Sequence, residues 1–274
     1  MVTAFDTERL ATILRDAAKA EIMPRFRRLS PGDIREKTSA VDLVTEADEA
    51  AERAIAAACR DAFPDAAFVG EEGVAADPGL IERVAQSDLA IVVDPIDGTA
   101  NFAAGAPMFG VMAAVVRRGE TIAGIIYDPL GDDFVLGERG AGAFLQRPDG
   151  ERHRLSFAAP APTQEMIGAA STSQLDPEER LRALTGFGQT RILCSYRTAA
   201  QEYRLAVSGA LHYLYYVKLM PWDHLAGALL SEEAGGYVRR LDGSPYRPGD
   251  VTGGLMVAPD ADGWQALSRL IGRS

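Results

Sequence analysis

The segment from Leu89 to Thr99 reads LAIVVDPIDGT, and its first half limits the possible folds of the chain most strongly. An unbroken apolar run, without the alternation of a half-exposed strand, is typical of a strand that is buried on both faces. Such a strand needs packed structure on each side. Two carboxylates, Asp94 and Asp97, follow it directly, so we expect them at an edge of the sheet, where ligand sites tend to form.

Strand and helix patterns are mixed along the rest of the chain, which predicts an α+β fold of stacked sheets and helices. Apolar residues with a helical period predict one helix that ends near Pro24 and another over residues 47–62. FGVMAAVVRRGETIAGIIYDP predicts two strands joined by a tight turn at Arg118-Gly119. Gly70 to Gly73, GEEG, is expected to form a loop after a short strand.

The stretch from Arg147 to Leu155 is polar and turn-rich, and it separates two patterns. Hairpins dominate before it, whereas strands and helices alternate after it. We therefore expect two subdomains, residues 1–150 and residues 151–274.

The charge of the chain restricts its partners. The formal net charge is −11 and the sequence pI is near 4.8, which disfavours nucleic acid and anionic lipid as partners. No window approaches the roughly twenty apolar residues of a membrane span, and the N-terminus lacks the apolar core of a signal peptide. Cys59 and Cys194 cannot form a disulfide framework. A cytoplasmic protein is the default expectation.

The DPID stretch has two readings, a turn rich in aspartate or a metal site. Pro95 makes the turn rigid, so Asp97 can point back toward Asp94 with the carbonyl of Ile96 between them. Two carboxylates that close repel each other unless a proton or a cation intervenes. Oxygen ligands select Mg²⁺ or Mn²⁺ over Zn²⁺. Since a turn explains the proline but not both aspartates, we favour the metal site.

Gly98 and Thr99 follow directly and offer backbone N–H groups. A short run of such groups can bind an anion. Together with a metal site, this turn suits a phosphate group.

Three further acidic residues lie at predicted element boundaries, where each could have a structural role instead. Thr45 and Asp48 have the spacing of a helix capping box, and capping is the more economical reading for them alone. Glu71 lies in the GEEG stretch, where a solvated turn is the alternative to a metal ligand. Asp223, in PWDHLAG, is near the start of a predicted helix and could cap it.

Taken in order, VDLVTEAD, GEE, DPIDGTANF and PWDHLAG with a later EAGG resemble the inositol monophosphatase family of Mg²⁺-dependent phosphatases. The matched motifs span roughly residues 37–237. The resemblance implies a layered αβαβα sandwich, shared with fructose-1,6-bisphosphatase, that usually forms a homodimer.

The resemblance also implies roles for individual residues. It implies that Mg²⁺ is bound by carboxylates and one carbonyl, those of Glu71, Asp94, Ile96, Asp97 and Asp223. It implies that Thr99 and Asp48 activate the attacking water. Substrate contacts would come from Asp97, Gly98, Thr99, Arg197, Thr198, Ala199 and Tyr216.

The substrate side departs from the family pattern. Arg197-Thr198-Ala199 stands where Gly-Thr-Ala is usual, and Tyr216 occupies the position of a glutamate that contacts inositol hydroxyls. Arg197 and Lys218 add positive charge that would suit a second phosphate or a carboxylate, although surface salt bridges would explain them equally well.

The leading hypothesis is a Mg²⁺-dependent phosphomonoesterase that acts on a small phosphorylated alcohol. Inositol phosphate, histidinol phosphate, a sugar bisphosphate and 3′-phosphoadenosine phosphate all remain open as substrates. A non-catalytic protein that binds a metal or a phosphometabolite is one alternative, and a metal-free hydrolase with paired carboxylates is another.

Overall fold

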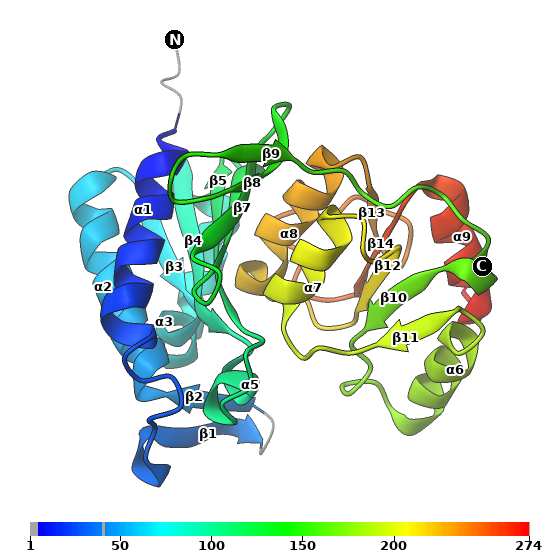
Figure 1. The fold of residues 1–274 in the computed structure, drawn as a ribbon, viewed down its shortest axis with the longest axis horizontal. Helices are drawn as coiled ribbons and strands as arrows, with labels where there is room; N and C mark the ends of the chain where they lie inside the picture. Colours follow the sequence, from blue (N-terminus) through cyan, green and yellow to red (C-terminus); the bar gives the residue numbers. More distant parts are fainter. Residues whose placement is uncertain (1–4, 40–41, 274) are drawn as a thin grey trace.

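A computed structural model describes residues 5–39 and 42–273 of the protein, which fold into five layers. Figure 1 shows them edge-on in the order helices, first sheet, helices, second sheet and outer helices. The helix pairs are α1 (Thr7–Ala17) with α2 (Glu46–Ala62), α7 (Ala199–Val207) with α8 (Pro221–Glu233), and α6 (Pro177–Phe187) with α9 (Ala261–Leu270).

The first sheet has seven strands in the order β3-β4-β5-β6-β7-β8-β9. Only β3 and β4 are parallel, and the other neighbours are antiparallel. The strands are β3 (Ala67–Gly70), β4 (Leu89–Asp97), β5 (Gly110–Arg117), β6 (Glu120–Asp128), β7 (Asp133–Glu138), β8 (Gly142–Gln146) and β9 (Arg152–Arg154). The predicted tight turn at Arg118-Gly119 joins β5 to β6. Because β9 still pairs with β8, this sheet extends past residue 150.

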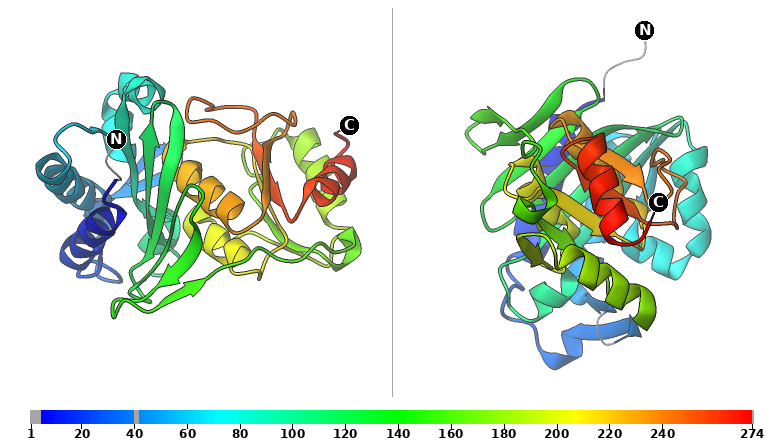
Figure 2. Two further views of the ribbon diagram at one scale, coloured as in Figure 1. Left: turned by 90° about the horizontal axis from the view of Figure 1, so that it is seen from above. Right: turned by 90° about the vertical axis from the view of Figure 1, so that its right-hand side faces the viewer.

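The second sheet has five strands in the order β11-β10-β12-β14-β13. Its members are β10 (Ile167–Ala170), β11 (Ile192–Cys194), β12 (Tyr213–Tyr216), β13 (Tyr237–Arg240) and β14 (Leu255–Ala258). Helices α7 and α8 lie between the two sheets, and α6 and α9 cover the outer face of the second sheet (Figure 2). The layered α+β sandwich predicted for the chain is confirmed.

Strand β4 lies in the middle of this arrangement and is buried on both faces, as its sequence predicts. Ile91 and Val93 pack toward α1 and α2, whereas Ala90 and Val92 belong to the cluster that includes α8. The strand is longer than expected. It continues past Val93 to Asp97, because its register against β5 shifts between Asp94 and Asp97 and the irregularity accommodates the extra residues.

The N-terminal helices follow the predicted pattern. Helix α1 continues into a π-helical stretch, Ala18–Ile22, so the helical segment ends just before Pro24. A hairpin of β1 (Ile34–Ser39) and β2 (Asp42–Thr45) precedes α2. Its pairing was not evident in the sequence.

The expectation of a loop at GEEG was wrong. Glu71–Ala76 forms a short helix, α3, that begins directly after β3. The remaining short helices are α4 (Arg83–Gln86) and α5 (Thr99–Ala103), with 3-10 turns at Pro31–Asp33, Pro78–Glu82 and Thr163–Glu165.

The first prediction concerns the stability of the central strand. Ile91→Ala removes a side chain that is 1% exposed, so we expect a loss of about 2–5 kcal/mol in the free energy of unfolding, measured by urea denaturation. Ile192→Ala, at a site that is 46% exposed, is the matched control. Similar losses in both variants would contradict the placement of β4 in the core.

Candidate metal centre

Three carboxylates meet between the two sheets. Asp94 and Asp97 come from the end of β4, and Asp223 comes from the first turn of α8. One oxygen from each of the three lies within 4.8 Å of the others. Residues up to 129 positions apart in the chain thus form one acidic cluster, as the combined motifs indicated.

Burial makes this cluster electrostatically unfavourable by itself. Asp94 is 2% exposed and Asp97 is 8% exposed, while Asp223 keeps part of its surface open to solvent. Loss of hydration raises the pKa of Asp94 well above its usual value, and repulsion from Glu71, Asp97 and Asp223 adds to the shift. Loss of hydration also raises the pKa of Asp97, to about 6. Protons or a cation would relieve the repulsion.

Asp97 is anchored to the N-terminus of α7. Its carboxylate accepts a hydrogen bond from the hydroxyl of Thr198, the N-cap residue of the helix, and another from the N–H of Ala200 at 2.7 Å. These bonds favour the ionised carboxylate and partly offset the rise in its pKa. They also hold the helix start against the first sheet. Thr198, predicted as a substrate contact, therefore has a structural partner in Asp97.

The turn after Asp94 is stabilised internally. The Asp94 carboxylate accepts the N–H of Ile96 at 2.9 Å, and the Ile96 carbonyl oxygen lies 3.0 Å from the Thr99 hydroxyl. Gly98 follows with φ of 91°, a conformation that favours glycine. A side chain there would also come within 3.0 Å of the Met108 carbonyl oxygen and of the Thr198 side chain. Both constraints require a glycine at this point of the motif.

Asp48 both caps a helix and contacts another predicted site residue. It completes the predicted capping box of α2, since one carboxylate oxygen accepts the N–H of Thr45 at 2.9 Å and also the Thr45 hydroxyl. Its other oxygen lies 3.1 Å from the Thr99 hydroxyl. Capping thus orients the carboxylate toward Thr99, and the two readings of this motif are compatible.

Glu71, at the start of α3, lies near the cluster but is not one of the three carboxylates whose oxygens lie within 4.8 Å of one another. Its charge contributes to raising the pKa values of Asp94, Asp97 and Asp223, for each of which loss of hydration is the largest cause. The carboxylates and the Ile96 carbonyl, which are the predicted ligands, offer only oxygen donors. Such a set fits a hard divalent cation.

The predicted substrate side lies on the loops before α7 and α8. Arg197 and Lys218 are exposed, and neither forms an ion pair with any residue of the described ranges 5–39 and 42–273. The charge of Lys218 opposes the rise in the pKa of Asp223, so it lies near the cluster. Tyr216 is 4% exposed, and its hydroxyl donates to Glu202 at 2.8 Å. Direct contacts of these residues with substrate stay predictions.

Two polar residues that support the loop before α7 were not identified from the sequence. The carboxylate of Glu202 also accepts the N–H of Tyr196 at 2.9 Å, and burial raises its pKa to about 7. The side-chain amide of Asn101 donates to the carbonyls of Tyr196 and Met108 at 2.8 and 2.9 Å. The position of Asn101 directly after DPIDGTA was the one available signal.

Comparison with known proteins relates nearly the whole chain to one family. The model of the inositol monophosphatase family matches residues 6–272. A fructose-1,6-bisphosphatase/inositol-1-monophosphatase from Thermotoga maritima is 32% identical over 219 residues, 77% of this chain and 76% of that protein. Nus factor SuhB from Pseudomonas aeruginosa is 34% identical over 231 residues, 81% of each chain. The crystal structure of SuhB from Bartonella henselae has a TM-score of 0.81, with 25% identity over 97% of this chain and 98% of that one.

The second prediction links the cluster to pH. The raised pKa of Asp97 means that, without metal, its contribution to stability is full below about pH 4 and is lost as the pH rises through about 6. Mg²⁺ has to displace those protons. We therefore expect Mg²⁺ to raise the melting temperature more at about pH 8 than at about pH 5. Equal shifts at both pH values, with NaCl of matched ionic strength as the control, would contradict a cation among these carboxylates.

Proposed function

The chain belongs to the inositol monophosphatase family, and we propose that it is a Mg²⁺-dependent phosphomonoesterase acting on a small phosphorylated alcohol. The relatives that are named as phosphatases support phosphatase chemistry. The observation that carries the proposal is the cluster of buried carboxylates beside the Asp48–Thr99 pair. Helix capping alone would not require several carboxylates to lie so close together.

The proposed cation ligands are the carboxylates of Glu71, Asp94, Asp97 and Asp223, with the carbonyl of Ile96. When bound, Mg²⁺ would neutralise phosphate charge and lower the pKa of an attacking water. Mn²⁺ fits the same oxygen donors. The ligands come from β4, α3 and α8, so the site depends on the packing of both sheets.

The proposed route for the proton uses Thr99 and Asp48. The Thr99 hydroxyl can donate its proton to the Asp48 oxygen at 3.1 Å and accept one from water at the same time. Thr45 occupies the other Asp48 oxygen, so the carboxylate cannot turn away from Thr99. No covalent intermediate is needed, because positioned charge and a positioned base suffice.

The phosphate group is assigned to the turn at Gly98 and Thr99. N–H groups in the first turn of a helix have no partner inside the helix, and Thr99 opens α5. Arg197, Thr198, Ala199 and Tyr216 are assigned to the substrate side. Without a carboxylate at position 216, an inositol phosphate has less support as substrate than an ester with a second anionic group.

A non-catalytic role is the second candidate, and similarity to proteins named Nus factor SuhB favours it. Of the proposed catalytic residues, Asp48 and Thr99 are both present and in hydrogen-bond contact. We rank catalysis first because a binding protein has no need for this pair.

The third prediction separates the two candidates. We expect phosphate release from at least one of inositol phosphate, histidinol phosphate, a sugar bisphosphate and 3′-phosphoadenosine phosphate, with loss of release in EDTA. Asp48→Asn removes the base and should lower kcat about 10²–10⁴-fold. Asp33→Asn, the same change at another capping box, is the control. No Mg²⁺-dependent release from the whole panel would favour the non-catalytic role, whereas full activity of Asp48→Asn would contradict the proposed role of Asp48 as the base.

The fourth prediction concerns the exposed cations. Arg197→Gln combined with Lys218→Gln should raise KM about tenfold for 3-phosphoglycerate, which has a carboxylate beyond its phosphate, and leave KM for glycerol 1-phosphate unchanged. Arg180→Gln, an exposed arginine on α6, is the control. An equal change for both esters would show that these cations do not recognise a second anion.

A further inference from the structure

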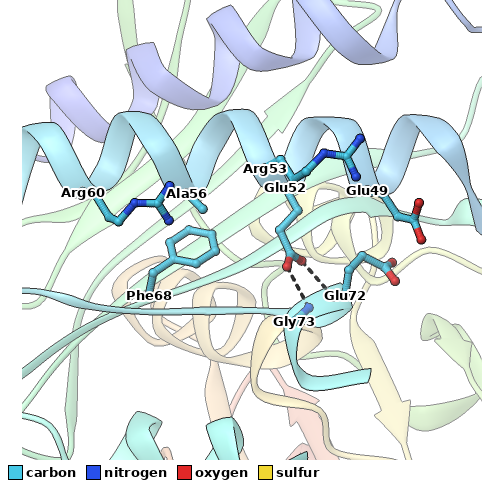
Figure 3. A pocket seen from close by; sticks show the side chains of 8 residues that line it. All are labelled: Glu49, Glu52, Arg53, Ala56, Arg60, Phe68, Glu72 and Gly73. Carbon is cyan, nitrogen blue, oxygen red and sulfur yellow. Dashed lines mark hydrogen bonds between the residues drawn. The ribbon is translucent and has the colours of Figure 1, made fainter. Parts of the chain in front are cut away.

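Glu52 is a buried carboxylate that the proposed mechanism does not use. It lies on α2 and is 8% exposed. Its two oxygens accept the backbone N–H groups of Glu72 at 2.8 Å and Gly73 at 2.7 Å (Figure 3). The two bonds join the middle of α2 to the start of α3, across 20 and 21 residues of chain.

The start of α3 needs this partner. The first N–H groups of a helix have no acceptor inside it, and an N-cap side chain usually supplies one. Here the N-cap residue is Gly70, which has no side chain to offer. Glu52 supplies the missing acceptor from a neighbouring helix and caps both the second and the third residue of α3.

The absence of a side chain at Gly70 leaves room for the Glu52 carboxylate. Its backbone, with φ of −105° and ψ of 157°, is one that any residue can adopt. A Cβ atom at this position, however, would lie 2.3 Å from the carboxyl carbon of Glu52. The small residue allows the carboxylate to sit directly under the helix start.

The residue held between these contacts is Glu71, which lies between Gly70 and the capped N–H of Glu72. Its charge contributes to the raised pKa values of Asp94, Asp97 and Asp223. Helix α2 carries Asp48 one turn before Glu52, so the same helix orients Thr99 and the start of α3.

We infer that Glu52 is a positioning residue for Glu71: it fixes the first turn of α3 so that the Glu71 carboxylate meets the Asp94–Asp97–Asp223 cluster. The inference rests on the proposed function of that cluster as a cation site. A glutamate is needed for this purpose, because both oxygens accept and the charge strengthens both bonds. A glutamine would turn an NH₂ group toward one of the two N–H groups.

The fifth prediction follows from this role. Glu52→Gln should weaken binding of Mn²⁺ to the metal-free protein about tenfold, measured by calorimetry and by electron paramagnetic resonance. At saturating Mn²⁺, kcat should return to within about twofold of the unaltered protein, because Glu52 touches no reacting atom. Glu49→Gln is the matched control, since Glu49 is on the same helix, lines the same pocket as Glu52 and pairs with Arg35.

Unchanged Mn²⁺ affinity in Glu52→Gln would overturn the inference and leave the proposed function standing. No Mn²⁺ binding by the unaltered protein would overturn both. A loss of kcat that saturating Mn²⁺ does not restore would assign Glu52 a different role and also contradict the inference.

A second pair of variants tests the contact itself. When Glu52 is present, Gly70→Ala should lower both the melting temperature and the Mn²⁺ affinity, because the methyl group of the alanine displaces the Glu52 carboxylate. In a Glu52→Ala background the same change should have little further effect, since the obstructing side chain is absent. Additive effects of the two changes would contradict the proposed contact.

Discussion

The hydrogen bonds between Asp97 and the N-terminus of α7 connect the two halves of the structure. Asp97 ends the central strand of the first sheet, whereas α7 belongs to the helical layer that lies between the two sheets. A carboxylate so deeply buried needs hydrogen-bond donors. The first turn of a helix supplies them, because its backbone N–H groups have no acceptor inside the helix. The bonds therefore place the sheet edge, the loop before α7 and the acidic cluster relative to one another.

The cluster has an energetic cost that the surrounding helices only partly offset. Asp94, Asp97 and Asp223 are brought within 4.8 Å, and burial raises the pKa of each. The helices around them direct the carboxylates inward, with Asp48 held by its capping box and the start of α3 held by Glu52. An arrangement that concentrates negative charge so consistently is best explained by a cation that binds there, and we propose that the adjacent Thr99 and Gly98 bind the phosphate group.

Much of this could be predicted from the sequence, because local patterns carry it. The apolar run before Asp94 predicted a strand buried on both faces, and Thr45 with Asp48 predicted a capping box. Contacts between distant segments could not be predicted in this way. Glu52 caps the start of the helix at GEEG from a distant helix, and an irregular pairing with β5 accompanies the extension of β4. Glu202 accepts hydrogen bonds from Tyr196 and Tyr216, which come from different elements. No described helix is long and apolar enough to cross a membrane. The homodimer, the cytoplasmic location and the two subdomains stay predictions.

The central claim is that Asp94, Asp97 and Asp223 bind a divalent cation together. Anomalous diffraction from crystals grown with Mn²⁺ tests it most directly, because the peak locates the ion without reference to activity. The account predicts a peak between these carboxylates, near the Ile96 carbonyl, that disappears in crystals of Asp94→Asn. Well-ordered carboxylates with no peak between them, or Mn²⁺ bound only elsewhere on the chain, would contradict it.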